Sequence, residues 1–101
     1  MYDVSLSQQA EKDLDGIVGF VAQSSPAGAD HVWTHLSSAI NSLEVFPQRG
    51  APAVEEAQSW GVEVRALIVF GYCIFYTVRR PEVVVLRIVH GRRRRPVSLE
   101  D

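Results

Sequence analysis

The chain has 101 residues, of which 47% are hydrophobic and 22% are charged, and its formal net charge is −2. This length and composition exclude intrinsic disorder and predict one domain, because domains commonly contain roughly 100–150 residues and apolar material offsets chain entropy. The single cysteine, Cys73, excludes a disulfide framework. No apolar run reaches the roughly 18 residues of a membrane span, and residues 1–6 lack a signal-peptide pattern, so we expect a cytoplasmic protein with no membrane partner.

The charges are distributed unevenly. Residues 1–48 contain one lysine and six acidic residues, whereas residues 64–96 contain eight arginines and a single acid, Glu82. Arginine presents a planar fork of donors that suits carboxylates and phosphates. The second half is therefore predicted to meet an anionic partner, either a nucleic-acid backbone or an acidic protein. The alternative is a solvated surface that the acidic first half balances.

The chain begins with a predicted strand and helix. Residues 2–7 alternate apolar and polar side chains, as in a half-buried strand. Ser7 fits a helix N-cap. After it, apolar residues recur at helical spacing, namely Ala10, Leu14, Ile17, Val18 and Val21.

A second helix is predicted to start at Ser25 and Pro26, a serine cap followed by proline at the first helical position. Its apolar face comprises Ala29, Val32, Trp33, Leu36, Ala39, Ile40 and Leu43. The helix should end near Phe46, because Pro47 disfavours helical backbone in the residue before it. An irregular loop is expected from there to Gly61.

Residues 62–69, 72–78 and 83–89 are rich in β-branched and apolar side chains, and short turn segments separate them. This pattern predicts an antiparallel meander. The predicted order is β-α-α-β-β-β, an α+β fold in which a two-helix hairpin packs on one face of a small antiparallel sheet.

Three polar side chains within these strands are candidates for chemistry. Arg65 and Arg87 could hold a phosphate, and His90, at a strand end, could act as a general acid or base. The alternative for the arginines is an outward, wet position in which Glu63 or Glu82 pairs with them. The alternative for His90 is a hydrogen bond to the backbone or to a neighbouring side chain.

The remaining reactive or aromatic residues favour structural roles. His31 and His35 lie one helical turn apart, but no further ligand clearly completes a metal set, and no phosphate loop or cofactor motif is present, so we expect neither metal nor cofactor. Cys73 is predicted in the core, because nothing in the sequence would activate it as a nucleophile. Trp33 fits a core position, and Trp60 fits either a lid over the core or an exposed anchor. The aromatic residues 72, 75 and 76 are expected to pack within the sheet.

Four consecutive arginines, Arg92, Arg93, Arg94 and Arg95, are the strongest electrostatic feature. Such a run can bind phosphates or an acidic partner, or it can be a flexible, solvated tail. We expect a single domain over residues 1–95, followed by a short tail over residues 96–101.

Four segments in order resemble the RelE/ParE toxin superfamily. Residues 63–78 resemble its central strands, with Arg65 before an apolar run, a turn, Tyr72 and then Tyr76. Residues 83–93 resemble its last strand, in which Arg87, two apolar residues and His90 precede a basic tail. Residues 7–14 and 43–50 resemble its first helix and the end of its helical hairpin. The likeness covers nearly the whole chain.

This resemblance implies the toxin of a type II toxin–antitoxin module, which causes growth arrest and which a cognate antitoxin neutralises. ParE-like members act on DNA gyrase, whereas RelE-like members cleave messenger RNA on the ribosome. Gly91 and Arg92 follow His90 where RelE-like chains often carry tyrosine or lysine, so the ParE-like activity, without catalysis of its own, is favoured.

Two other functions remain open. In a ribonuclease, Arg65, Arg87 and His90 would be catalytic; a non-toxic member would only bind its antitoxin. Whether the chain binds its target or its antitoxin, the predicted contact residues are Trp60, Arg65, Arg79, Arg80, Arg87, His90 and Arg92–Arg95.

Overall fold

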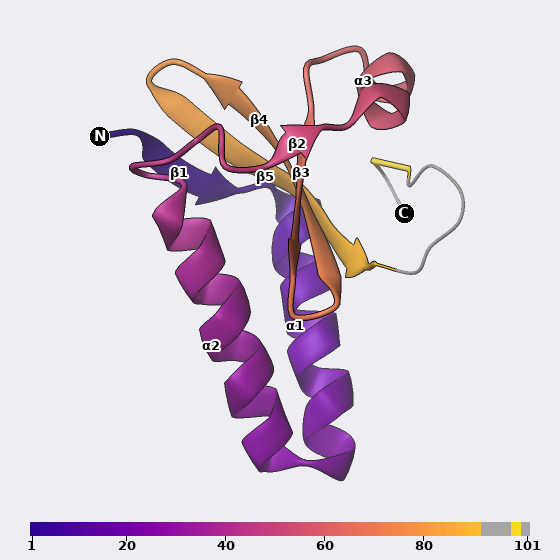
Figure 1. Ribbon diagram of the computed structural model, residues 1–101. Helices are drawn as coiled ribbons and strands as arrows, with labels where there is room; N and C mark the ends of the chain where they lie inside the picture. The colour runs from indigo at the N-terminus through magenta and orange to yellow at the C-terminus, as the bar shows by residue number, and fades with distance from the viewer. Residues whose placement is uncertain (92–97, 100–101) are drawn as a thin grey trace.

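The computed structural model describes residues 1–91 and 98–99. Its elements, in order, are β1 (Asp3–Leu6), α1 (Gln8–Ser24), α2 (Pro26–Ser42), β2 (Ala51–Pro52), α3 (Val54–Trp60), β3 (Arg65–Val69), β4 (Tyr72–Arg79) and β5 (Glu82–His90). The long helices α1 and α2 form a hairpin on one side of the sheet, and the short helix α3 lies apart from them (Figure 1). The predicted α+β class and helical hairpin are confirmed.

Serine caps fix the start of both long helices. The Ser7 side chain accepts a hydrogen bond from the Ala10 N–H, and the Ser25 side chain accepts one from the Gly28 N–H. Pro26 occupies the first turn of α2, where its missing N–H costs nothing. Both predicted starts are confirmed. However, α2 ends at Ser42, short of the predicted position near Phe46, and turns follow it.

The sheet has the order β1-β5-β4-β3-β2 and is mixed. The predicted meander of β3, β4 and β5 is confirmed, but β1 pairs with β5 in parallel. The expectation of a wholly antiparallel sheet was therefore wrong. The physical reason is that the rest of the fold separates these two strands in sequence, so no hairpin turn dictates their relative direction.

Residues 47–61 are the second difference from the sequence prediction, which placed an irregular loop there. They contain β2, which pairs with two residues of β3, and the seven-residue helix α3. Glu55 and Glu56 stand in the first turn of α3, where the helix dipole favours acids, and Gly61 ends it with φ of 73°. The sequence did not predict these elements, because β2 and α3 are too short for their apolar pattern to be distinguished from that of a loop.

The hydrophobic core is divided between the two faces of the sheet. The larger cluster joins α1 and α2 to the sheet and includes Leu36, Leu43, Ile74, Tyr76 and Val85, all essentially inaccessible. The smaller cluster lies beneath α3 and contains Ala53, Val64, Cys73, Phe75 and Val89. Trp33 is 50% exposed, so its predicted core position was wrong, because it lies at the border of the α2 apolar face.

Candidate functional site

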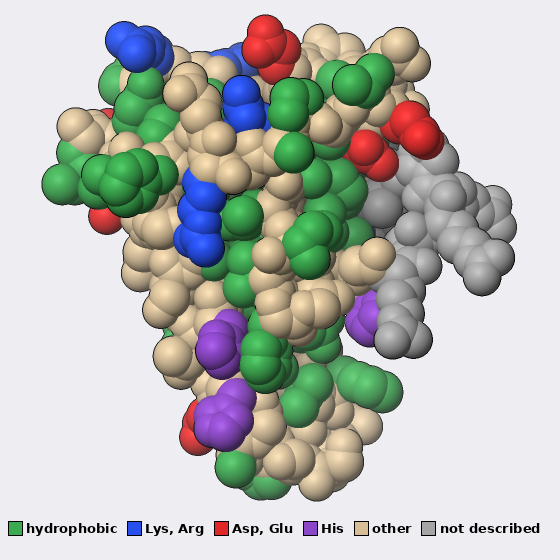
Figure 2. Space-filling view, in the orientation of Figure 1, with side chains coloured by type: hydrophobic (Ala, Val, Ile, Leu, Met, Phe, Trp, Pro, Cys, Tyr) green, Lys and Arg blue, Asp and Glu red, His purple; other side chains and the backbone are tan. Residues whose placement is uncertain are grey.

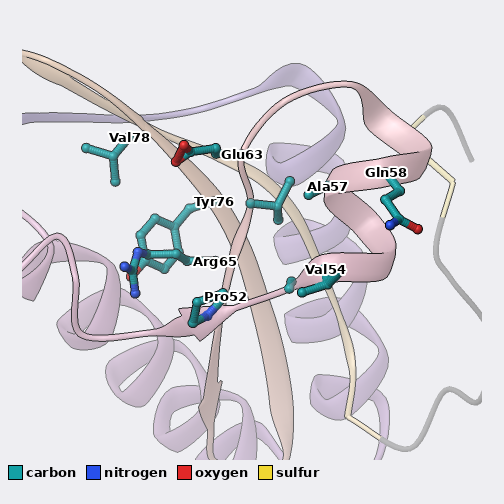
Figure 3. A pocket seen from close by; sticks show the side chains of 10 residues that line it. Pro52, Val54, Ala57, Gln58, Glu63, Arg65, Tyr76 and Val78 are labelled. Atoms are coloured by element: carbon teal, nitrogen blue, oxygen red, sulfur yellow. The ribbon is translucent and has the colours of Figure 1, made fainter.

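Arg65 lines a hollow of about 340 Å³ between α3 and the sheet. In Figure 3, Val54, Ala57 and Gln58 border it from α3, whereas Arg65, Tyr76 and Val78 border it from β3 and β4. Its walls are largely apolar, and charge enters through Arg65 and Glu63. The hollow therefore suits an apolar group that carries a polar or anionic end.

Backbone carbonyls of the preceding loop hold the Arg65 guanidinium. Its Nη1 donates to the Gly50 carbonyl oxygen, and it lies 3.4 Å from the Gln48 carbonyl oxygen. The buried Tyr76 hydroxyl accepts a hydrogen bond of 2.8 Å from the Gly50 N–H, which fixes the same loop. No carboxylate pairs with Arg65 in the described part of the chain, so the alternative of a pair with Glu63 or Glu82 was wrong for this residue, and no described acid neutralises the guanidinium charge.

Arg87 has a different environment. Its Nε lies 2.8 Å from Asp13 Oδ2 and its Nη2 lies 2.9 Å from Asp13 Oδ1, a two-pronged ion pair between β5 and α1. The two side chains are 4% and 14% exposed. The alternative of an outward, wet position for Arg87, with Glu63 or Glu82 as its partner, was therefore wrong. The reason is that β1 ends beside residue 85 of β5, and α1 brings a carboxylate to the edge beyond it.

His90 borders a second hollow, of about 410 Å³, between α1 and β5. Its ring lies edge-on to Tyr72, with 5.7 Å between the centroids. Lys12, Phe20 and Arg87 also line this hollow. Arg65 does not line it, so the structure distributes the three ribonuclease candidates over two hollows.

Arg79 and Arg80 stand exposed at the β4–β5 turn. Arg80 lies over the Tyr2 ring, with 5.8 Å from its guanidinium carbon to the ring centroid. Arg65 is in register with Tyr76, and Arg79 follows three residues later on β4, about 10 Å along the strand. Arg65 and Arg79 therefore belong to one end of the sheet, and the visible basic side chains lie over the upper left of the molecule in Figure 2.

The aromatic residues of the sheet have packing roles. Phe75 and Tyr76 are buried, as predicted, and Tyr72 packs against the larger core cluster. Trp60 packs edge-on against Phe75, with 5.5 Å between centroids, and it covers the smaller core cluster as a lid. Burial, and to a lesser degree the charge of Glu56, raises the pKa of the Cys73 thiol from 9.0 to about 11, which opposes a nucleophilic role.

His31 and His35 lie on α2, where His35 stacks on Phe70 with 4.2 Å between ring centroids. Within residues 1–91 and 98–99, no three or more His, Cys, Asp or Glu side chains come together in a metal-binding group. In the same part of the chain, no helix has the length and apolar character needed to cross a bilayer. The Arg92–Arg95 run and the predicted boundary at residue 95 lie outside the described residues.

Sequence reasoning missed Asp13 as a site residue. In the sequence, Asp13 is only an acidic residue near the start of a predicted helix, a position that the helix dipole already favours. Its relation to Arg87, 74 residues later, depends on how α1 packs against β5. The carbonyls of Gln48 and Gly50 carry no side-chain signal at all.

Comparisons with known proteins agree with this fold. The family model described as the ParE toxin of the type II toxin–antitoxin system parDE matches residues 4–95. A solved structure from P. aeruginosa, described as a chromosomal ParDE TA system, superposes with a TM-score of 0.70 at 22% identity. The match covers 89% of this chain and 96% of that chain. No curated protein sequence matches the chain significantly.

Proposed function

Because this chain belongs to the ParE family of type II toxin–antitoxin toxins, we propose that it inhibits DNA gyrase and thereby arrests replication. As the toxin component of such a pair, its partner is a cognate antitoxin. Gyrase is the proposed target, and the cytoplasm is the proposed compartment in which the toxin meets it. The toxin acts by binding, without covalent chemistry of its own.

The separation of Arg65, Arg87 and His90 is the observation that supports this proposal. Cleavage of RNA at a 2′-hydroxyl needs a base, an acid and cationic groups around one phosphate. Asp13 neutralises Arg87 in a buried pair, and Arg65 and His90 border different hollows. The described residues therefore favour recognition over catalysis.

The contact surface that we propose includes Arg65, Arg79 and Arg80 at one end of the sheet. In the described residues no carboxylate lies within ion-pair distance of these three guanidinium groups. Beside Arg65, the hollow under α3 adds apolar area from Val54 and Val78. An anionic partner segment with apolar side chains would match both features. Trp60, His90 and Arg92–Arg95 remain further predicted contacts.

The test combines a cellular and a purified assay. Induction of the chain in bacteria should give filamentation and halted DNA synthesis with intact transcripts, and the purified toxin should inhibit supercoiling by gyrase. Arg65→Ala should raise the concentration needed for half-maximal inhibition by about tenfold, the equivalent of about 1.4 kcal/mol. Relaxation by topoisomerase I serves as the control and should not change.

Other outcomes would contradict the proposal. Rapid cleavage of ribosome-bound transcripts would make the chain a ribonuclease. Normal growth, together with uninhibited gyrase, would leave only the antitoxin-binding role. If Arg65→Ala weakens antitoxin binding but leaves gyrase inhibition unchanged, the end of the sheet contacts the antitoxin alone.

A further inference from the structure

The connection between α2 and β2 exposes two large apolar side chains next to each other. Val45 is 58% exposed and Phe46 is 65% exposed. Single apolar side chains are common on protein surfaces, so their exposure does not by itself indicate a function. What distinguishes this pair is the rigidity of the connection that carries it and the charge that surrounds it.

Residues 43–50 are fixed to the domain along their length. Three of them are buried and hold the connection in place, namely Leu43, Pro47 and Gly50. The Phe46 N–H donates to the Ser42 carbonyl oxygen at 2.9 Å, and the Phe46 carbonyl oxygen accepts from the Arg49 N–H at 3.1 Å. Because its backbone is already ordered, Phe46 can enter a contact with little further loss of conformational entropy.

This connection joins the two places at which arginines of the proposed contact surface lie. Near its start, the Glu44 carbonyl oxygen accepts the Tyr2 N–H at 2.8 Å, and the Arg80 guanidinium lies over the Tyr2 ring. Near its end, the Gln48 carbonyl oxygen lies 3.4 Å from Arg65 Nη1. The connection passes beside β1 before it reaches β2 (Figure 1). The two exposed apolar side chains therefore stand on the stretch between these two arginines.

The arginines at this end of the domain carry charge that no described acid neutralises. They are Arg49, Arg65, Arg79 and Arg80. Among the described residues the one ion pair joins Arg87 to Asp13, and the Arg49 guanidinium donates to the neutral Ser42 hydroxyl at 2.8 Å. These positive charges remain available to carboxylates of a partner, and they border exposed apolar area.

A protein partner matches this arrangement better than a nucleic acid does. Three acidic residues lie at the same end of the domain, namely Asp3, Glu44 and Glu82. They would repel the phosphates of a nucleic-acid backbone, whereas a protein surface can place carboxylates and donors separately. The aliphatic Val45 also fits an apolar recess, while contacts to a phosphate backbone are polar. An apolar centre with a polar rim is typical of protein–protein interfaces.

We infer, on the basis of the proposed inhibition of gyrase, that Phe46 is the apolar anchor of the surface that contacts this target. With Val45 beside it, Phe46 enters an apolar recess of gyrase whose rim carries carboxylates for Arg65 and Arg80. Aromatic side chains and arginines are enriched in the cores of interfaces, where a few such residues contribute most of the binding free energy.

Phe46→Ala tests the anchor, because it removes an exposed ring and should leave the thermal midpoint unchanged. The toxin concentration for half-maximal inhibition of gyrase supercoiling should rise about tenfold. Phe46→Leu keeps an apolar side chain and should retain most of the inhibition. Ile68→Ala on β3 is the matched control, because Ile68 is 64% exposed and borders neither the hollow of Arg65 nor that of His90, so inhibition should not change.

Crosslinking tests the contact directly. Substitution of Phe46 by p-benzoylphenylalanine should give a light-dependent crosslink between the toxin and a gyrase subunit, and the same substitution of Ile68 should give none. A crosslink from position 46 to DNA alone, or to the antitoxin but not to gyrase, would overturn the inference by assigning this surface to another partner.

The two proposals fail in different ways. If the parent toxin inhibits gyrase and Phe46→Ala inhibits it equally, the anchor is wrong and the proposed function stands. If the parent toxin neither binds nor inhibits gyrase, the proposed function is wrong and the anchor is rejected with it.

Discussion

Strands β5 and β3 lie on either side of the central strand β4, and their outer edges are closed in different ways, although each strand contains an arginine at a similar place in the sequence pattern. At the β5 edge, α1 supplies Asp13, which neutralises Arg87 and satisfies the Ile88 N–H. At the β3 edge, β2 reaches only Arg65 and Ala66. There, loop carbonyls hold the Arg65 guanidinium, which stays half-buried beside an open hollow.

This difference shows what determines the role of an arginine in a strand. Both guanidinium groups donate hydrogen bonds to the protein, but among the described residues only Arg87 has a carboxylate that cancels its charge. A guanidinium bound to carbonyls keeps its positive charge, which can attract an anion from outside. The ion pair places Arg87 in the architecture of the domain, whereas Arg65 is the arginine that we propose for recognition.

Replacement of each arginine by leucine should give the largest difference in the free energy of unfolding between the two strands. Arg87→Leu leaves the Asp13 carboxylate buried without its partner, so the free energy of unfolding should fall by about 3–5 kcal/mol. Arg65→Leu leaves no buried charge unpaired and removes hydrogen bonds to the carbonyls of Gln48, which is exposed, and of Gly50, so the loss should be smaller, about 1–2 kcal/mol. Urea denaturation with unchanged slope measures both values. Equal losses would contradict the comparison.

The loop at the β3 edge should be sensitive to added volume. A Cβ on Gly50 would lie 2.8 Å from the Ala66 carbonyl oxygen and 2.9 Å from the Tyr76 hydroxyl, so Gly50→Ala should cost about 1–3 kcal/mol. Gly16→Ala on α1 is the matched control, because outside its own stretch of helix no atom lies within 4 Å of the added Cβ. That control should stabilise the helix, by up to about 1 kcal/mol.

Tyr76→Phe isolates one hydrogen bond of the same edge. It removes the acceptor of the buried Gly50 N–H and keeps the ring, so it should cost about 1–3 kcal/mol. The Gly50 amide should then exchange with solvent faster than in the parent chain, while the Ile88 amide at the opposite edge should keep its protection. Faster exchange at both amides would indicate global loosening of the sheet.

The last prediction concerns Cys73, which lies between the two edges on β4 and whose effect appears only at high pH. Its thiol has a pKa raised to about 11 in the folded state and ionises near 9 in the unfolded state. The unfolded chain therefore releases this proton first, and stability should fall as the pH rises from about 9 to 11. Cys73→Ser should reduce this loss, measured as unfolding free energy against pH. Rapid alkylation of the native thiol at pH 8 would contradict its burial.

Local sequence determined much of the fold. Ser7 and Ser25 with Pro26 fixed the helix starts, because capping depends on a few adjacent residues. Helical spacing in α1 and α2, and the change of period in the second half, indicated the hairpin and the meander. The segments that resemble toxins of the RelE/ParE superfamily predicted the family, and the match over residues 4–95 confirmed the ParE assignment.

Only the tertiary structure decided the rest. The parallel pairing of β1 with β5, the exposure of Trp33 and the different environments of Arg65 and Arg87 all depend on segments distant in sequence. Neither arginine differs from the other in its local pattern, since each stands in an apolar strand. The packing of α1 places Asp13 beside Arg87 and brings no carboxylate to Arg65, and this contact between distant elements gives the two arginines their different environments.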